Sequence, residues 1–341
     1  MASLNAIAQK LVRSGKGILA ADESEPTIAK RFSAIGLTST ETLRRDYREM
    51  LFRSEEAMRS FISGVILTEE TLEQKAADGT PFRELLKSYD VIPGIKVDKG
   101  AFPLPGNNGE KITEGLDGLR QRLARYAELG AGFAKWRSVI TITETTPTRN
   151  AIRANANDLA RYAMLCQEAG IVPVVEPEVL ADGIPGDHSI ARCEDVTGET
   201  LEAVFRELRL AGVELSGMLL KPNMVLAGIK ASHQPDVEMV ARRTVDCLLA
   251  NVPAAVPGIA FLSGGQTDEE ATAHLSAINR LGPLPWHVTF SYGRALQNAA
   301  LNIWKGKPEN VPAAQRAFTH RARMNALASM GQWLKENDRA A

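Results

Sequence analysis

The chain has 341 residues, 44% of them hydrophobic, which is enough for one large α/β barrel or for two to three smaller domains. Its 40 Lys and Arg residues nearly balance 41 Asp and Glu residues, and the formal net charge at pH 7 is -1. This balance excludes a global electrostatic attraction to nucleic acid or to an anionic membrane, so we expect neither as a partner.

Eight short apolar runs, rich in Ile, Val, Leu and Phe, predict eight buried strands. They are apolar on both faces, which is typical of parallel strands that helices cover. In chain order the runs are GILAADES (17–24), ISGVILTEE (62–70), VIPGIKVDK (91–99), GFAKWRSVI (132–140), IVPVVEPEV (171–179), GMLLKPNMV (217–225), GIAFLSGG (258–265) and WHVTFSYG (286–293).

Segments with a 3.6-residue apolar period lie between these runs and predict helices, among them 41–58, 115–130, 155–170, 236–252 and 268–282. Strand and helix therefore alternate eight times. This predicts an α/β fold, a single (β/α)8 TIM barrel domain over residues 1–341. An open doubly wound sheet is the alternative, less favoured because no GxGxxG motif follows the first run and no linker divides the chain.

The segments before Gly17 and after Lys305 lie outside the eight units and predict additional N- and C-terminal helices. Residues 1–16 contain no apolar core of signal-peptide length, and no stretch approaches the roughly 18 apolar residues of a membrane span. An organelle-targeting segment within 1–16 stays open, since this segment has Arg13 and no acid. We expect residues 331–341 to form a short, mobile tail.

The three cysteines are odd in number and widely spaced, without a Cys-x-x-Cys pair or a Cys/His cluster suited to zinc. They are Cys166, Cys193 and Cys247. A disulfide framework does not fit this pattern, so we expect a reducing compartment and a cytoplasmic protein.

Charged and polar residues stand at the carboxyl ends of the predicted strands, where a barrel places its active site. Residues two apart on a strand share a face, so each pair points the same way. Such a set would shift the pKa values of its members, as acid–base sites require, whereas a single pair could be an ion pair at the barrel mouth. The residues are Asp22 and Ser24, Lys96 and Asp98, Lys135 and Arg137, Glu176 and Glu178, and Lys221.

Lys221 is the strongest candidate nucleophile, because it follows GMLL and precedes Pro222. Apolar surroundings and a neighbouring cation, which Lys135 can supply, both favour the neutral amine that attacks a ketone. A lysine salt-bridged across the barrel mouth is the structural alternative. Lys135 and Lys96 are rival nucleophiles, less suited because each stands two residues from another charge.

Two separate groups of residues are suited to phosphate, which needs backbone N–H groups, close approach at glycine and a cation. Ser263 and Gly264 stand near the end of the seventh run, and Arg294 follows the eighth, the usual phosphate-binding place of a barrel. The second group comprises Lys96, Arg137, Ser24 and Arg31. Two anion sites that flank a lysine predict a bisphosphate substrate.

The five histidines form no HxH, HExxH or His-x-x-x-His pattern. We therefore expect no metal site, and no cofactor other than a covalent intermediate on Lys221.

Several segments together resemble the class I fructose-1,6-bisphosphate aldolase family, in order from about Ala6 to Gln332. The LLKPNMV and FAKWR segments are highly specific to that family. The matching segments are GKGILAADES (15–24), GIKVDKG (94–100), FAKWR (133–137), VEPEVL (175–180), LLKPNMV (219–225), FLSGGQ (261–266) and TFSYGRALQ (289–297).

The resemblance implies a role for each candidate residue. Lys221 would form the Schiff base, and Glu176 would serve carbinolamine formation and dehydration, with Glu178 near the amine. Asp22 would take the proton from the C4 hydroxyl, and Lys135 would be the permanent cation. The implied binding residues are Ser263, Gly264 and Arg294 for the C1 phosphate, and Lys96, Arg137, Arg31, Ser24 and Thr27 for the C6 phosphate.

Two features depart from the family's animal members. Glu25 and Pro26 replace a Thr-Gly pair, and an acid beside a phosphate site would weaken or reshape it. The chain ends GQWLKENDRAA, without the longer extension and final Tyr that assist enamine protonation in animal enzymes, so that proton has no assigned donor.

The implied function is the reversible cleavage of fructose 1,6-bisphosphate to dihydroxyacetone phosphate and glyceraldehyde 3-phosphate in glycolysis or gluconeogenesis. The resemblance also implies small sugar phosphates as partners and a homotetramer. Three alternatives are an aldolase for another ketose phosphate such as sedoheptulose 1,7-bisphosphate, a catalytically impaired oligomeric scaffold, and a metal-dependent aldolase.

Overall fold

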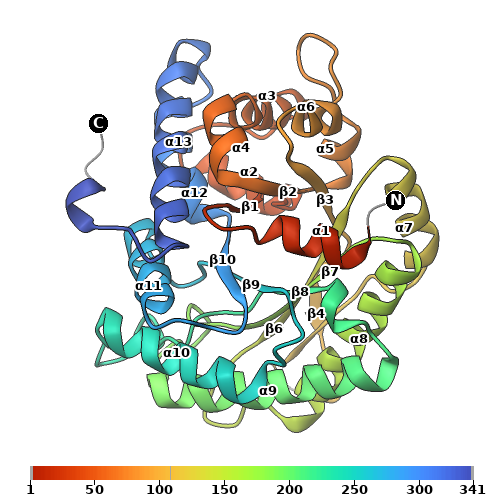
Figure 1. Ribbon diagram of the computed structural model, residues 1–341, viewed down its shortest axis with the longest axis vertical. Helices are drawn as coiled ribbons and strands as arrows, with labels where there is room; N and C mark the ends of the chain where they lie inside the picture. The colour runs from red at the N-terminus through yellow and green to blue at the C-terminus, as the bar shows by residue number, and fades with distance from the viewer. Residues whose placement is uncertain (1–2, 108, 339–341) are drawn as a thin grey trace.

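The computed structural model describes residues 3–107 and 109–338. Eight parallel strands close into a barrel in the order β1-β10-β9-β8-β7-β6-β3-β2, and Figure 1 shows the helices around it. Each strand lies within one of the eight predicted runs, so the predicted (β/α)8 TIM barrel is confirmed. The strands are β1 Gly17–Ala20, β2 Ile62–Leu67, β3 Ile92–Lys96, β6 Phe133–Ile140, β7 Val172–Val179, β8 Leu219–Leu220, β9 Gly258–Phe261 and β10 His287–Tyr292.

The helices differ from the predicted ranges in two places. Segment 41–58 forms two helices because the backbone of Ser54 leaves the helical region, with φ -75° and ψ 73°. Segment 155–170 belongs to a longer helix whose first turn is capped by the Thr148 side chain. The helices are α1 Leu4–Leu11, α2 Glu25–Ser33, α3 Glu41–Phe52, α4 Glu55–Phe61, α5 Glu69–Glu73, α6 Phe82–Ser88, α7 Leu119–Glu128, α8 Arg149–Glu168, α9 Ile190–Ala211, α10 Val237–Asn251, α11 Asp268–Arg280, α12 Arg294–Trp304 and α13 Val311–Ala328, with 3-10 turns at Leu215–Gly217, Pro308–Asn310 and Lys335–Asn337.

Helix α1 closes the amino-terminal end of the barrel and crosses in front of the strands in Figure 1. Leu11 and Val12 are buried and pack with Ile18, at the start of β1. Glycines in the neighbouring strands make room for them: a Cβ on Gly64 would lie 2.6 Å from Leu11, and one on Gly258 would lie 2.6 Å from Val12. Burying a Leu or Val side chain contributes about 2 kcal/mol, so the predicted N-terminal helix is part of the core.

A short antiparallel hairpin follows β3 and was not predicted. It consists of β4 Ala101–Pro103 and β5 Lys111–Thr113. The hydroxyl of Thr113 donates a 2.8 Å hydrogen bond to the Arg137 carbonyl of β6. The hairpin therefore lies against the carboxyl end of β6, next to the predicted site residues.

The described part of the C-terminal tail is anchored on α13. Arg321 donates to the Asp338 carboxylate at 2.7 Å, and the indole N–H of Trp333 donates to it at 3.0 Å. Trp333 is itself buried. These contacts hold the tail as far as Asp338 against α13, residues 339–341 lie outside the described residues, and the mobility of the tail over 331–341 stays a prediction.

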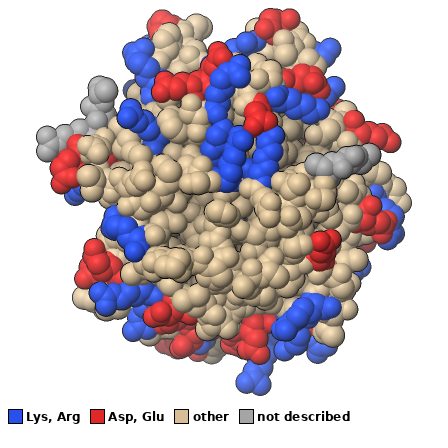
Figure 2. Space-filling model, in the orientation of Figure 1, with Lys and Arg blue, Asp and Glu red and all other residues tan. Residues whose placement is uncertain are grey.

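On the face of the molecule in Figure 2, acidic and basic side chains are interspersed around the rim, a group of mostly basic ones extends from the upper edge toward the middle, and the area below the middle is mostly uncharged. This mixture agrees with the net charge of -1. No helix in the described part of the chain is long and apolar enough to cross a membrane.

Candidate active site

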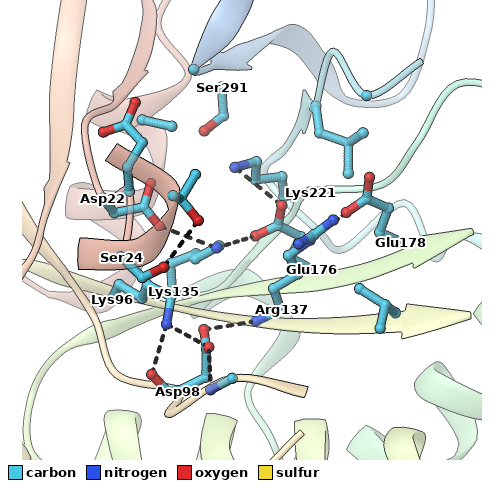
Figure 3. Close-up of a pocket in the computed structure, with 18 of the residues that line it drawn as sticks. Asp22, Ser24, Lys96, Asp98, Lys135, Arg137, Glu176, Glu178, Lys221 and Ser291 are labelled. Carbon is cyan, nitrogen blue, oxygen red and sulfur yellow. Dashed lines mark hydrogen bonds and ion pairs between the residues drawn. The ribbon is translucent and has the colours of Figure 1, made fainter. Parts of the chain in front are cut away.

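The carboxyl ends of the barrel strands surround one pocket of about 480 Å³. Every residue that we predicted for the site lines it, although these residues come from seven of the eight strand–helix units. Figure 3 shows their charged groups pointing toward one another across the pocket. The predicted lining residues are Asp22, Ser24, Thr27, Arg31, Lys96, Lys135, Arg137, Glu176, Glu178, Lys221, Ser263, Gly264 and Arg294.

Lys221 is held directly after β8. Its backbone N–H donates to the Val175 carbonyl of β7 at 2.8 Å, which fixes the start of the side chain. The side chain is only 4% exposed, and its Nζ lies 3.2 Å from Oε1 of Glu176 (Figure 3). Lys221 is thus a buried amine next to a carboxylate that lies within reach of its proton.

Lys135 joins two carboxylates. Its Nζ lies 3.0 Å from Oε2 of Glu176 and 3.2 Å from Oδ2 of Asp22. Burial alone would lower the pKa of Lys135, but the carboxylates of Asp22, Glu176 and Asp98 outweigh burial and raise this pKa above its ordinary value. Lys135 is therefore a permanent cation rather than a nucleophile.

Asp22 stays ionised for the complementary reason. Burial would raise the pKa of this carboxyl, but Lys135, Lys221 and Lys96 lower it from 3.8 to about 2. Asp22, Lys135, Glu176 and Lys221 thus form one chain of alternating negative and positive groups, drawn with dashed lines in Figure 3.

Glu178, which we expected near the Lys221 amine, has an ion-pair partner on β6. It forms an ion pair with Nε of Arg137, and Glu176 is the carboxylate next to the Lys221 amine. Glu178 is the first cause of the raised pKa of Arg137. The two glutamates stand on the same face of β7, but the one nearer the end of the strand reaches Arg137 on β6.

One predicted phosphate region is built from two loops. Ser263 is buried, and Gly264 fits tightly, because a Cβ there would lie 2.7 Å from Oε1 of Glu178. Gly293 caps the amino terminus of α12, and Arg294 begins that helix with half of its side chain exposed. Backbone N–H groups, a helix terminus and a guanidinium together suit a phosphate.

The second predicted region lies around the amino terminus of α2. The hydroxyls of Ser24 and Thr27 lie 3.0 Å apart, and Lys96 pairs with Asp98 at 2.6 Å. Arg31 lies between the two regions rather than in this one alone, since its Nη2 would be 3.7 Å from a Cβ on Gly293.

Glu25 does not face the pocket. It is exposed, lies 3.8 Å from Arg44 of α3, and is absent from the pocket lining, whereas Pro26 is part of it. The acid that departs from the animal members therefore points away from the predicted phosphate region.

In the described residues there is no cluster of three or more His, Cys, Asp or Glu side chains that could hold a metal ion.

The family model "Fructose-bisphosphate aldolase class-I" matches residues 3–341. The chain belongs to this family. The chain is 54% identical to the probable fructose-bisphosphate aldolase class 1 of Xanthomonas campestris pv. campestris, over 96% of this chain and 97% of the relative. It is 53% identical to the fructose-bisphosphate aldolase C of Carassius auratus, over 97% of this chain and 91% of the relative.

A solved structure agrees with the family. The fructose-bisphosphate aldolase of Plasmodium falciparum, crystallised in complex with TRAP and a small-molecule inhibitor, superimposes with a TM-score of 0.93. It is 50% identical and covers 97% of this chain and 95% of its own. The resemblance inferred from the motifs is thus confirmed, and the protein is an aldolase of the lyase class.

Pocket residues of this aldolase that were not predicted include Ser291 and Glu23. Ser291 on β10 is 1% exposed, and its hydroxyl has no hydrogen-bond partner in the part of the chain that the structure describes. Thr289, two residues earlier on the same face, could have indicated it. Glu23 also lines the pocket and accepts hydrogen bonds from Arg31 and Arg48. Strand β1 ends at Ala20, so alternation along the strand could not place Glu23.

Proposed function

We propose that this aldolase reversibly cleaves fructose 1,6-bisphosphate to dihydroxyacetone phosphate and glyceraldehyde 3-phosphate through a Schiff base on Lys221. One observation carries the proposal. The buried Nζ of Lys221 lies 3.2 Å from Glu176, whose other oxygen is held by the permanent cation Lys135.

The first half of the reaction forms the iminium. Glu176 accepts a proton from Lys221 Nζ, and the neutral amine attacks C2 of the ketose. The C2=O π bond breaks, a proton of the attacking nitrogen passes to the C2 oxygen, and a carbinolamine with a C2 hydroxyl forms. The protonated Glu176 then donates a proton to the C2 hydroxyl, which leaves as water. This acid–base role needs a carboxyl within hydrogen-bond reach of the amine, as Glu176 is.

The second half breaks the C3–C4 bond. Asp22 takes the proton of the C4 hydroxyl, the C3–C4 electron pair moves into the iminium, and the C4 carbonyl of the aldehyde product forms. The iminium becomes an enamine, so no metal ion is needed to accept charge. Lys135 keeps Asp22 ionised, and its 3.2 Å contact supports this role.

The binding roles divide between the two ends of the pocket. Ser263, Gly264 and Arg294 would hold the C1 phosphate, and Ser24, Thr27 and Lys96 the C6 phosphate. Arg31 and Arg137 would complete the positive charge along the pocket. In this proposal Glu178 acts by orienting Arg137, because that is its ion-pair partner.

Borohydride trapping tests the nucleophile. Reduction in the presence of dihydroxyacetone phosphate should give one adduct, which peptide mapping places on Lys221. The Lys221→Arg variant should stay folded and lose turnover, whereas Lys230→Arg, an exposed lysine nine residues further on, should keep it. An adduct on another lysine, or full activity in Lys221→Arg, would refute the mechanism.

Two further properties rest on family membership. We propose that the aldolase is a homotetramer and acts in the cytoplasm. Light scattering coupled to size exclusion checks the first, and fractionation of its host cells checks the second. Comparison of kcat/KM for fructose 1,6-bisphosphate and sedoheptulose 1,7-bisphosphate separates the two substrate proposals.

A further inference from the structure

Arg294 of the proposed C1-phosphate region has a partner that the reaction does not use. Its Nη2 lies 3.4 Å from Oδ2 of Asp182, and the two side chains are 50% and 36% exposed. Asp182 stands on the loop between β7 and α9, three residues after β7 ends. A carboxylate and a substrate phosphate therefore have access to the same guanidinium.

The backbone of the Asp182 loop is fixed on both sides. Hydrogen bonds of 3.1 and 2.8 Å link the carbonyls of Ala181 and Gly186 to the N–H groups of Ile229 and Lys230. On the other side, a Cβ on Gly265 would lie only 2.7 Å from the Cβ of Ala181. The loop is thus packed against the turn that carries Ser263 and Gly264, and Asp182 has a defined position beside it.

The two side chains are free to change partners, although the loop is fixed. Arg294 is half exposed and bonded to Asp182 through one nitrogen, at a distance longer than a strong charge-assisted hydrogen bond. An exposed ion pair of this kind is weak enough for a phosphate dianion to displace. After displacement, the Asp182 carboxylate would stand close to the phosphate and repel it.

We infer that Asp182 is a positioning residue that competes with the C1 phosphate for Arg294 and thereby weakens substrate binding. This inference rests on the proposed role of Arg294. Because the competition stabilises only the free enzyme, its loss strengthens the binding of substrate and transition state equally, so KM falls and kcat is unchanged.

The test is the kinetics of Asp182→Asn with two substrates, fructose 1,6-bisphosphate and fructose 1-phosphate, which has the C1 phosphate alone. KM for both should fall by about two- to fivefold, the range that an exposed ion pair supports, while kcat and its pH profile stay unchanged. Asp182→Glu should keep the wild-type values. Asp187→Asn is the matched control, because Asp187 is an exposed acid on the same loop with no ion pair among the described residues.

Arg294 variants separate this inference from the proposed site. In an Arg294→Ala background, Asp182→Asn should no longer lower KM, because the shared partner is missing. Suppose that Arg294→Ala raises KM for fructose 1-phosphate, but Asp182→Asn in the wild-type background leaves this KM unchanged or raises it. Asp182 is then not a competitor, whereas the assignment of Arg294 to the phosphate site stands. If Arg294→Ala leaves KM unchanged, both assignments are wrong, whereas adduct formation at Lys221 would be unaffected.

Discussion

Replacing Lys135 by Met tests whether the chain of alternating charges determines the ionisation of the site. Lys135 is 5% exposed and contacts Glu176 at 3.0 Å and Asp22 at 3.2 Å. With an effective dielectric constant of about 20, each contact corresponds to about 5 kcal/mol of Coulomb energy before the cost of desolvation. Because the variant leaves two buried carboxylates without their shared cation, we expect a net loss of about 3–5 kcal/mol in the free energy of unfolding.

The sign of the pH dependence gives this prediction a second test. In the wild type, the pKa of Asp22 is lowered from 3.8 to about 2. This shift contributes about 2 kcal/mol to the free energy of unfolding above about pH 4, and the contribution is lost as the pH falls toward 2. Without Lys135, burial would raise the pKa of Asp22. The folded variant then binds more protons than its unfolded chain, so acid stabilises it. The difference between wild type and variant in the free energy of unfolding should therefore shrink from pH 7 to about pH 4.

Urea unfolding followed by circular dichroism, measured at several pH values, gives both quantities. Loss of general-base ionisation should also lower kcat by about 100-fold or more. Lys307→Met, which removes an exposed lysine after α12, is the control for the loss of one charge. A deficit below about 1 kcal/mol, or one that does not change with pH, would contradict the proposed coupling.

Two further variants test the packing around the site and the tail. Gly264→Ala places a Cβ 2.7 Å from Oε1 of Glu178 and should displace that carboxylate. KM should rise several-fold, and the free energy of unfolding should fall by about 1–3 kcal/mol. An unchanged KM would show that the turn adapts. Asp338→Ala leaves Arg321, whose side chain is 7% exposed, without its carboxylate, so the free energy of unfolding should fall by about 3 kcal/mol while kcat is kept. Urea unfolding and limited proteolysis of the tail check the second variant, and wild-type stability would mean that the Asp338 contact is dispensable.

The fold could be predicted because barrel strands are buried on both faces, which leaves continuous apolar runs in the sequence. All six residues of β2 and all eight of β7 are buried. The break between α3 and α4 was not predictable in the same way. Apolar residues continue at helical spacing through Ser54, although the backbone leaves the helical region there.

The site was predictable as a set of residues but not as a set of pairs. Two rules predicted that the charged residues share one pocket: residues two apart on a strand point to the same face, and barrel active sites lie at the carboxyl ends of the strands. The partner of each carboxylate depends on how far its side chain reaches across the strands, so the ion pair of Glu178 with Arg137 was not predicted. The contact of Asp182 with Arg294 joins a loop residue to the first residue of α12, 112 residues apart in the chain, which no local pattern encodes.

In the proposed mechanism Lys221 must lose a proton, and the charge pattern of the site favours Glu176 as its acceptor. Two carboxylates and two ammonium groups make the chain from Asp22 to Lys221 neutral when all four are ionised. Proton transfer from Lys221 to Glu176 keeps it neutral, whereas release of the proton to solvent would leave a net negative charge in a buried place. Asp22 does not take this proton in the proposal, because burial is outweighed by Lys135 and two further lysines, which lower the pKa of Asp22 to about 2. In the proposed mechanism, the same arrangement lets Glu176 take the proton of Lys221 and later donate it to the C2 hydroxyl when the carbinolamine loses water.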